Sequence, residues 1–157
     1  MSRFFVIITI FVSMASSAMA QSGLAIEPVI KGEYSSDAKV TATYMTAPNK
    51  YLRNHKLTVL ASFKGPAAVY AKDLERMVLA DGASAVGKNV RYKKGKLYFA
   101  FYMLRPVVHG KEKLNRYLYY LNSSAGSGSD ILLVYLEGKA GEQDVTELIK
   151  SMAKNAR

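Results

Sequence analysis

Two segments in the first half of the chain alternate between apolar and polar residues, a pattern typical of β-strands with one buried face. They span residues 39–45 and 56–64, with turn residues at 47–50 between them. The apolar positions are Val40, Ala42 and Tyr44 in the first segment and Leu57, Val59, Ala61 and Phe63 in the second. The pattern therefore predicts two half-buried strands.

A helix is predicted directly after the second strand. Pro66 suits the first helical position. The following apolar residues recur at i, i+4, i+7 and i+8 and form one stripe of Tyr70, Leu74, Met77 and Val78. Asp81-Gly82 is expected to end the helix, with the glycine supplying a left-handed cap.

Four further strands are predicted at residues 89–93, 96–104, 116–122 and 131–136. Lys94-Gly95 indicates a tight hairpin between the first two. Residues 123–129 are rich in serine and glycine and indicate a flexible loop.

A second helix is predicted at the C-terminal end. Asp144 is its expected cap, with Glu147 three residues later as in a capping box. The apolar face consists of Val145, Leu148, Ile149 and Met152. The predicted order is β-β-α-β-β-β-β-α, which favours an α+β fold: an antiparallel sheet of about five to six strands with two helices on one face.

Residues 1–20 have the pattern of a cleavable signal peptide. Arg3 precedes an apolar run, and Ala18-Met19-Ala20 provides small residues at the cleavage position. The run is too short for a membrane-spanning anchor, which needs about 20 apolar residues. Cleavage would leave 137 of the 157 residues, beginning at Gln21, as a single domain over residues 21–157 without a transmembrane segment. The expected location is the periplasm or the cell exterior.

Three segments resemble a known group of proteins. They are Gly23-Leu24-Ala25-Ile26-Glu27-Pro28, Asn115-Arg116-Tyr117-Leu118-Tyr119-Tyr120 and Leu133-Val134-Tyr135-Leu136-Glu137-Gly138. Together they resemble small exported proteins of unknown function from Bacteroidetes. The resemblance implies a Gram-negative periplasmic or secreted setting and provides no catalytic residue.

The charge balance favours anionic partners. The chain has 22 Lys and Arg against 12 Asp and Glu, a formal charge of +10 that becomes +9 when Arg3 is removed. In an exported setting the candidate partners are lipopolysaccharide, an anionic glycan or another envelope protein. The chain has no dedicated nucleic-acid motif.

The strongest candidate binding feature is a basic hairpin around the predicted turn. It carries Lys88, Arg91, Lys93, Lys94 and Lys96, with Tyr92 among them and no acidic residue. Basic groups beside an aromatic ring can bind phosphates or sulfates and stack on a ring. The alternative is a solvated hairpin whose lysines discourage edge-to-edge aggregation.

Tyrosine is abundant, with eleven residues and no tryptophan. If helices cover the phenylalanine face of residues 96–104, Tyr98 and Tyr102 would line the opposite face and could contact sugar rings or a partner protein. The alternative is that the tyrosines complete a core.

Signals for catalysis are few. There is no cysteine, and no motif for a nucleophile, a metal or a cofactor is present, so none is expected. His109, which follows Arg105-Pro106, is predicted in a loop where an acid or base could act. The leading hypothesis is a non-enzymatic exported binding or interaction domain. The alternatives are a small hydrolase-like enzyme using His109 and Arg105, and a structural envelope accessory that adds a strand to its sheet edge.

Overall fold

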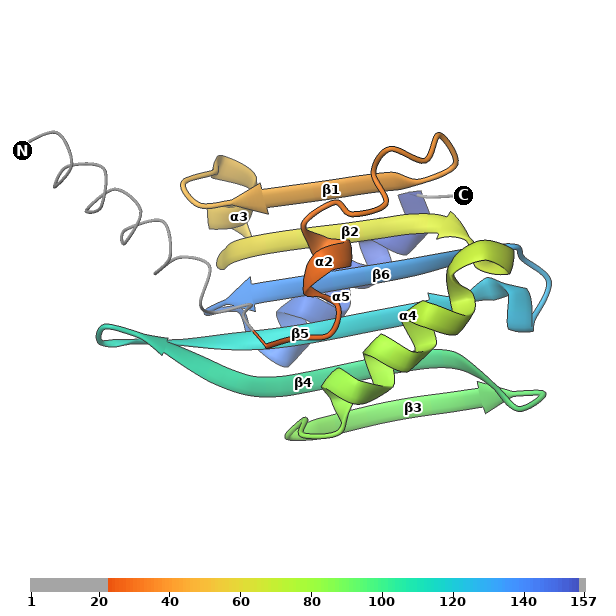
Figure 1. Ribbon diagram of the computed structural model, residues 1–157. Helices are drawn as coiled ribbons and strands as arrows, with labels where there is room; N and C mark the ends of the chain where they lie inside the picture. The colour runs from red at the N-terminus through yellow and green to blue at the C-terminus, as the bar shows by residue number, and fades with distance from the viewer. Residues whose placement is uncertain (1–22, 156–157) are drawn as a thin grey trace, which may run out of the picture.

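The computed structural model describes residues 23–155, so the predicted signal peptide lies outside the described residues. Six strands form one antiparallel sheet in the order β1-β2-β6-β5-β4-β3 (Figure 1). The strands are β1 (Thr41–Thr46), β2 (Leu57–Pro66), β3 (Gly87–Lys93), β4 (Lys96–His109), β5 (Glu112–Asn122) and β6 (Asp130–Gly138). The helices are α2 (Glu27–Ile30), α3 (Lys50–Asn54), α4 (Ala67–Gly82) and α5 (Glu142–Asn155), with a 3-10 turn η1 (Ser123–Ala125). The predicted α+β class and element order are confirmed, with short helices α2 and α3 in addition.

Each face of the sheet has its own hydrophobic core. On one face, α2 and α4 pack in a cluster that includes Leu74, Leu118 and Tyr120. On the other face, α3 and α5 pack in a cluster that includes Leu148 and Tyr117. Figure 1 shows α4 in front of the sheet and α5 behind it. We call these the α4-side core and the α5-side core.

The expectation of two helices on one face is therefore not confirmed. Strands β5 and β6 are buried along most of their length and present apolar side chains to both cores. Because successive residues of a strand point to opposite faces, a strand of this composition needs cover on both sides. The result is three layers, with the sheet in the middle.

The sheet has three register shifts, one each in the β2–β6, β3–β4 and β4–β5 pairs, and the first two redistribute apolar residues between the faces. In β2 the shift lies between Leu57 and Val59, so Leu57 joins the α5-side core whereas Val59 joins the α4-side core. In β4 the partner of Arg91 is Phe99 and the partner of Tyr92 is Leu97. Leu97 therefore joins the α4-side core, whereas Phe99 packs against the α5-side core. Such bulges break the period-two alternation of a strand, so simple alternation assigns Leu57 and Leu97 to the wrong faces.

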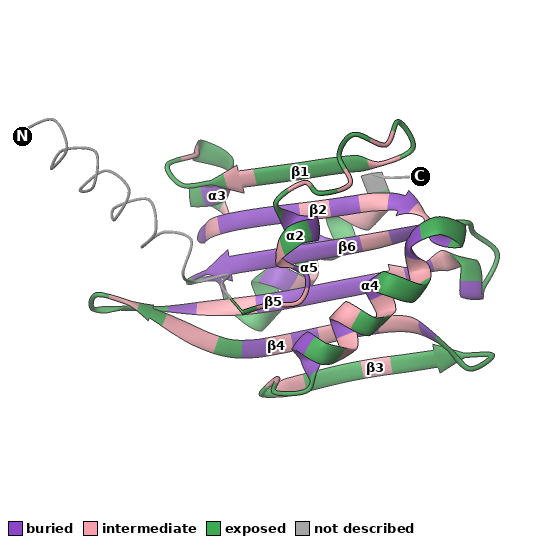
Figure 2. Cartoon of the chain, viewed as in Figure 1, coloured by how far each residue is buried: buried purple, intermediate pink, exposed green. Residues whose placement is uncertain are grey.

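The edge strands are the exposed ones, as Figure 2 shows. Strand β1 was expected to be half-buried, but five of its six residues are exposed and Met45 is intermediate. Tyr44 keeps 47% of its surface exposed. At the edge of the sheet β1 has a single neighbouring strand, β2, and neither core extends fully beneath it.

The helix boundaries differ slightly from those predicted. Pro66 is the N-cap of α4 and ends β2, so the helix begins at Ala67. Gly82 does not adopt a left-handed conformation; it lies against the ring of Tyr102, where a Cβ atom would clash. Helix α5 begins at Glu142, and Asp144 within its first turn accepts a hydrogen bond from the amide of Gly141 at 3.3 Å. The predicted cap therefore lies inside the helix and satisfies the amide that precedes it.

None of the helices within residues 23–155 has the length and apolarity that a membrane crossing requires.

Candidate functional site

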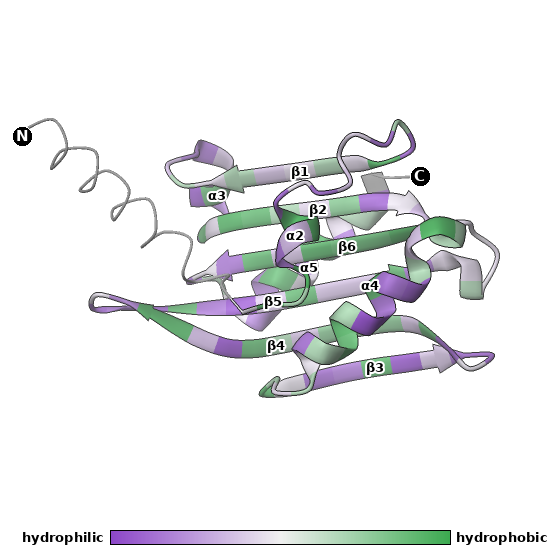
Figure 3. Ribbon diagram, viewed as in Figure 1, coloured by the Kyte–Doolittle hydropathy of each residue, from purple (hydrophilic) through white to green (hydrophobic). Residues whose placement is uncertain are grey.

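The basic hairpin forms as predicted. Lys94 and Gly95 connect β3 to β4 with φ values of 51° and 75°, and Lys93 pairs with Lys96 across the turn. Two adjacent positive φ values define the tight turn that matches strand twist. Figure 3 shows a mainly hydrophilic β3 beside hydrophobic central strands. The six residues of the hairpin that were predicted to contact a ligand are all exposed: Lys88, Arg91, Tyr92, Lys93, Lys94 and Lys96.

The structure separates these residues along the hairpin. Lys93, Lys94 and Lys96 gather at the turn, whereas Lys88 lies at the start of β3 and donates to the carbonyl of Ala83 at 3.1 Å. The guanidinium of Arg91 stands 5.6 Å from the centre of the Phe99 ring. Nζ of Lys93 stands 3.7 Å from the centre of the Tyr98 ring, within cation–π range.

The basic turn is one of three segments that meet at the same end of the sheet (Figure 1). The second is the serine- and glycine-rich connection at residues 123–129, and the third is the first half of α4. We call this region, at the C-terminal ends of β3 and β5 and the N-terminal ends of β4 and β6, the basic end.

Hydrogen bonds organise the serine- and glycine-rich connection. The Oγ atom of Ser123 donates to the carbonyl of Asp130 at 2.8 Å and accepts from its amide at 3.1 Å. The Ser123 carbonyl accepts from the amides of Gly126 and Gly128. Gly128 packs closely against Ser123. A Cβ atom at position 128 would overlap the Ser123 side chain, so the close approach requires glycine.

A cleft of about 900 Å³ opens at the basic end on the α4 side of the sheet. Its polar lining comes from α4 through Lys72, Glu75 and Arg76, from β4 through Lys96, and from the end of β5 through Asn122. Lys72 and Arg76 are four residues apart and so lie on one face of the helix. The cleft thus brings together cations from two separate segments.

A second hollow, of about 430 Å³, lies at the same end beside Lys64, Lys93, Tyr98 and Asp130. Ala153 of α5 also lines it, which places it on the α5 side. Across the two hollows, Lys and Arg outnumber Asp and Glu by five to two. The basic end therefore presents a positive surface on both faces of the sheet.

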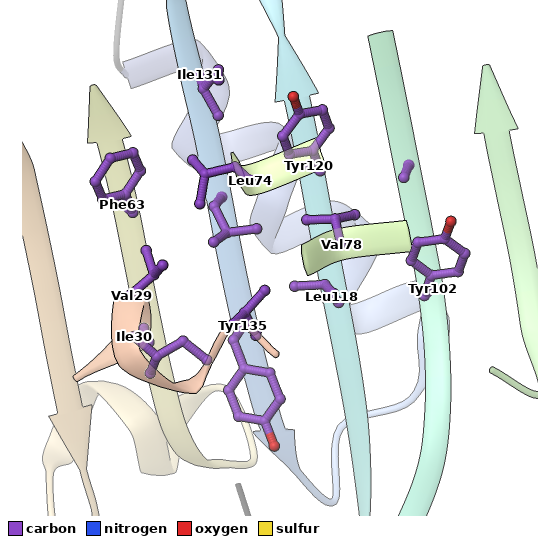
Figure 4. Close-up of a cluster of buried hydrophobic side chains, with 14 of the residues drawn as sticks. Val29, Ile30, Phe63, Leu74, Val78, Tyr102, Leu118, Tyr120, Ile131 and Tyr135 are labelled. Atoms are coloured by element: carbon purple, nitrogen blue, oxygen red, sulfur yellow. The ribbon is translucent and has the colours of Figure 1, made fainter. Parts of the chain in front are cut away.

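The open tyrosine face does not form, because both faces of the sheet are covered. Tyr102 is 3% exposed beneath α4, and Tyr117, Tyr119, Tyr120 and Tyr135 are also buried. Figure 4 shows Tyr102, Tyr120 and Tyr135 among the buried side chains of the α4-side core. Burial raises the pKa of Tyr102 above its ordinary value. Of the two predicted contact tyrosines, Tyr98 remains partly accessible, whereas Tyr102 belongs to the core.

Two buried polar side chains, Tyr120 and Asn122, lie close together at the end of β5, near the larger cleft. Tyr120 is fully buried and Asn122 is 1% exposed, and the Tyr120 hydroxyl and the Asn122 Nδ2 group are both shielded from solvent. Burial raises the pKa of Tyr120 to about 12, with the Glu75 carboxylate acting in the same direction and hydrogen bonding with the Asn122 side chain opposing the shift.

The two buried carboxylates at the other end of the α4 side have protein partners. Asp81 accepts from the amides of Ala25 at 2.6 Å and Ile26 at 3.0 Å, which fixes the N-terminal segment against α4. Glu137 accepts from the Tyr135 hydroxyl at 2.8 Å. Burial raises the pKa of Asp81, and these two amide hydrogen bonds oppose the shift. Both carboxylates thus have structural roles.

His109 lies far from the basic end, in the hairpin between β4 and β5 (Figure 1). The loop predicted after residue 104 is instead a continuation of β4, in which His109 pairs with Glu112. The Glu112 carboxylate is engaged by Lys139 at 2.8 Å. Arg105 is exposed, and its carbonyl accepts from Nε of Arg116 at 2.7 Å. His109 therefore lies apart from the residues that line the two hollows at the basic end.

Sequence reasoning missed the residues that the basic end adds to the hairpin. They are Lys64, Lys72, Arg76 and Asn122. Lys72 and Arg76 carry a local signal, since they share one polar helix face. Asn122 immediately precedes the serine- and glycine-rich segment, but nothing in the local pattern places it beside α4.

The fold and the basic end define a three-layer α+β domain with a positively charged cleft. The chain belongs to a family of unknown function (DUF6108), which it matches over residues 13–149. No curated protein and no solved structure matches the chain.

Proposed function

We propose that the protein is an exported, non-enzymatic binding domain whose basic end binds an anionic envelope partner, either lipopolysaccharide or an anionic glycan. The observation that carries this proposal is the gathering of cations from separate segments at one end of the sheet. Lys64 lies near the end of β2, Lys72 and Arg76 come from α4, and Lys93 and Lys96 flank the turn.

The charges of the turn are available to a ligand. Lys93, Lys94 and Lys96 are exposed, and none of them forms an ion pair with a carboxylate in the described part of the chain. Exposed cations attract anions over about 8–10 Å near physiological ionic strength. Attraction of this kind raises the rate and strength of association with a polyanion and weakens as salt increases.

Reversing the charge of the turn should weaken polyanion binding. We expect Lys93→Glu/Lys94→Glu/Lys96→Glu to lower the affinity for heparin or lipopolysaccharide by about tenfold or more at low salt. The affinity of the unmodified protein should itself fall as salt rises. The free energy of unfolding should change by less than about 1 kcal/mol, because exposed lysines contribute little to stability. Binding isotherms over a salt series and denaturation curves measure both effects.

The matched control reverses three charges at the opposite end of the sheet. Lys50, Lys111 and Lys113 are exposed and lie in α3 and around the β4–β5 hairpin. Lys50→Glu/Lys111→Glu/Lys113→Glu changes the net charge by the same amount, so a local site predicts a much smaller loss of affinity. Equal losses from the two triple variants would show that the whole charged surface, and not the basic end, attracts the polyanion.

Export is part of the proposal, and the resemblance to small exported proteins of Bacteroidetes supports it. Protein recovered from the cell envelope should have the intact mass of a chain that begins at Gln21, because Ala18-Met19-Ala20 provides the small residues that signal peptidase requires. Ala20→Leu, which puts a large residue at the cleavage position, should keep its full length. A recovered protein that still carries residues 1–20 would contradict periplasmic or secreted release.

One observation favours the structural-accessory alternative. Edge strand β1 is exposed and has no charged residue between Thr41 and Thr46, whereas edge strand β3 carries Lys88, Arg91 and Lys93. Charged edges hinder strand addition and uncharged edges permit it. Binding through β1 would be insensitive to salt and to charge reversal at the turn, which separates it from anion binding. For the enzyme alternative, His109 and Arg105 have no comparable support.

A further inference from the structure

The two hollows at the basic end share one wall, the connection between β5 and β6 at residues 123–129. Gly128 of this connection lines both hollows. Ser124 and Ser129 line the larger cleft on the α4 side, and Ser127 lines the smaller hollow on the α5 side. Figure 1 shows this connection at the end of the sheet, beside the start of α4. A ligand chain that leaves one hollow therefore reaches the other by crossing a single loop.

The larger cleft carries accessible cations. Lys72 and Arg76 are exposed on one side of α4, and Lys96 is exposed at the start of β4. Arg76 lies 4.0 Å from an oxygen of Asp73, but an exposed pair of this kind is weak, and an anionic ligand can compete for it. The carboxylate in the lining, Glu75, is half-buried and accepts a hydrogen bond from a backbone amide of β4 at 3.4 Å. The cleft therefore attracts an anionic group.

The smaller hollow has two cations of its own. Lys64 and Lys93 reach it from β2 and β3, which lie on either side of the central strands, and neither forms an ion pair in the described part of the chain. Nζ of Lys93 stands 3.7 Å from the centre of the Tyr98 ring, and this cation–π contact holds the ammonium group at the hollow. Asp130 is the carboxylate in the lining, so cations exceed acids here as well.

Between the two positive hollows, the connection presents hydroxyl groups and no charge. Ser127 and Ser129 are exposed, and a serine hydroxyl can both donate and accept hydrogen bonds, as sugar hydroxyls do. A lipid would instead need apolar surface for its acyl chains. In the part of the chain that the structure describes, the large apolar side chains exposed at the basic end are Val69 and Tyr92. This contrast favours an anionic glycan over lipopolysaccharide.

We propose that the basic end binds a linear anionic glycan, one chain of which occupies both hollows by passing over residues 123–129. Sulfate or carboxylate groups of the chain bind Lys72 and Arg76 in the larger cleft and Lys64 and Lys93 in the smaller hollow. This inference rests on the proposed anion binding and adds the class of ligand and its attachment at two points. Two-point attachment raises the affinity, because the second contact forms at a high effective concentration. It requires a chain long enough to span both hollows.

Heparin oligosaccharides of increasing length, from disaccharide to dodecasaccharide, test the two-point attachment. In NMR titrations of the isotope-labelled protein, the backbone amides of Lys72 and Lys64 report on the larger and the smaller hollow. We expect the disaccharide to bind the two hollows independently, with different midpoints at the two amides. Chains that span both hollows should shift both amides with one common midpoint and an affinity at least about tenfold higher. A smooth rise in affinity with length, with the two midpoints still separate, would overturn the proposal.

Two matched double variants each remove the cations of one hollow without adding negative charge. Lys72→Gln/Arg76→Gln changes the larger cleft, and Lys64→Gln/Lys93→Gln changes the smaller hollow. Each should lower the affinity for the dodecasaccharide by about tenfold or more and leave the disaccharide bound at the other hollow. Loss of affinity in only one of the two variants would show that the glycan binds at a single hollow, and the proposal would be wrong.

The control for these variants removes the same charge at the opposite end of the sheet. Lys111 and Lys113 are exposed around the β4–β5 hairpin. Lys111→Gln/Lys113→Gln should change the affinity for the dodecasaccharide by less than about threefold, because exposed charges are screened beyond about 10 Å. A loss as large as that of the two hollow variants would show that net charge, and not the two hollows, determines binding.

The outcomes also separate this inference from the proposed function. Heparin binding that is weakened by charge reversal at the turn, but shows no step with length, would leave anion binding at the basic end and refute two-point attachment. Dodecasaccharide binding that is unaffected by every variant at the basic end would refute both. If intact lipopolysaccharide bound more tightly than the dodecasaccharide and its deacylated form did not bind, the ligand would be a lipid and the choice of a glycan would be wrong.

Discussion

Leu148→Ala is expected to lower the free energy of unfolding by about 2–5 kcal/mol, the usual cost of truncating a buried leucine. Leu148 is 6% exposed in α5 and packs in the α5-side core with Val145 and Ile149. Truncation removes apolar contacts and leaves a cavity that the sheet beneath cannot fill by moving, because β5 and β6 are each paired on both sides. Chemical denaturation followed by circular dichroism measures the change.

The control for Leu148 is an aliphatic residue on the exposed side of a helix. Val69 of α4 keeps 60% of its surface exposed, so Val69→Ala should change stability by less than about 0.5 kcal/mol. If the denaturation midpoint of Leu148→Ala matched that of the unmodified protein, α5 would be a loosely attached tail. The α5-side face of the sheet would then require another cover.

Gly138→Ala is expected to destabilise the fold by about 3 kcal/mol or more, at the upper end of the cost of inserting a methyl group where there is no room. Gly138 ends β6 and pairs with Leu57 of β2 and Asn115 of β5. A Cβ atom there would lie 2.5 Å from the carbonyl oxygen of Lys56 and 2.6 Å from Cα of Leu57. Both are backbone atoms, one at the start of β2 and one in the residue before it, so relief requires the backbone there to separate from β6.

Gly141→Ala is the matched glycine control, three residues further along the chain. An added Cβ atom there meets only Asp144 Oδ2, at 4.0 Å. The substitution should lower the free energy of unfolding by at most about 1 kcal/mol. Gly141 directly precedes the first residue of α5, where replacing the capping residue has an effect of this size. Denaturation midpoints of the two variants give the comparison. Similar midpoints would mean that the end of β6 has enough freedom to move away from β2.

The sequence predicted features that depend on residues close together in the chain. The hairpin turn at Lys94-Gly95 follows from residues that adopt positive φ, and the buried faces of α4 and α5 follow from helical spacing. Val145, Leu148 and Ile149 are buried and Met152 packs against the same core, as that spacing predicts. The bulges in β2 and β4 were not predictable, because a one-residue shift leaves no consistent mark on the apolar–polar alternation.

The local sequence also does not determine that α4 and α5 pack on opposite faces of the sheet. Helical spacing shows which side of α4 and α5 is buried but not against which face of the sheet. That choice depends on the strand order, which puts β6 between β2 and β5 and surrounds the central strands with neighbours. The apolar residues on both faces of β5 then require cover from both sides.

The candidate site divides in the same way. By itself the sequence determined the basic hairpin, because its cations are neighbours along the chain and the turn between them is local. Only the tertiary structure decided that Lys72 and Arg76 of α4 lie beside Lys96 and Asn122, and that Tyr102 is covered and not open. Strand pairing and helix packing bring together groups separated by tens of residues, and these long-range contacts are set by burial over the whole domain, for which a local pattern carries no information.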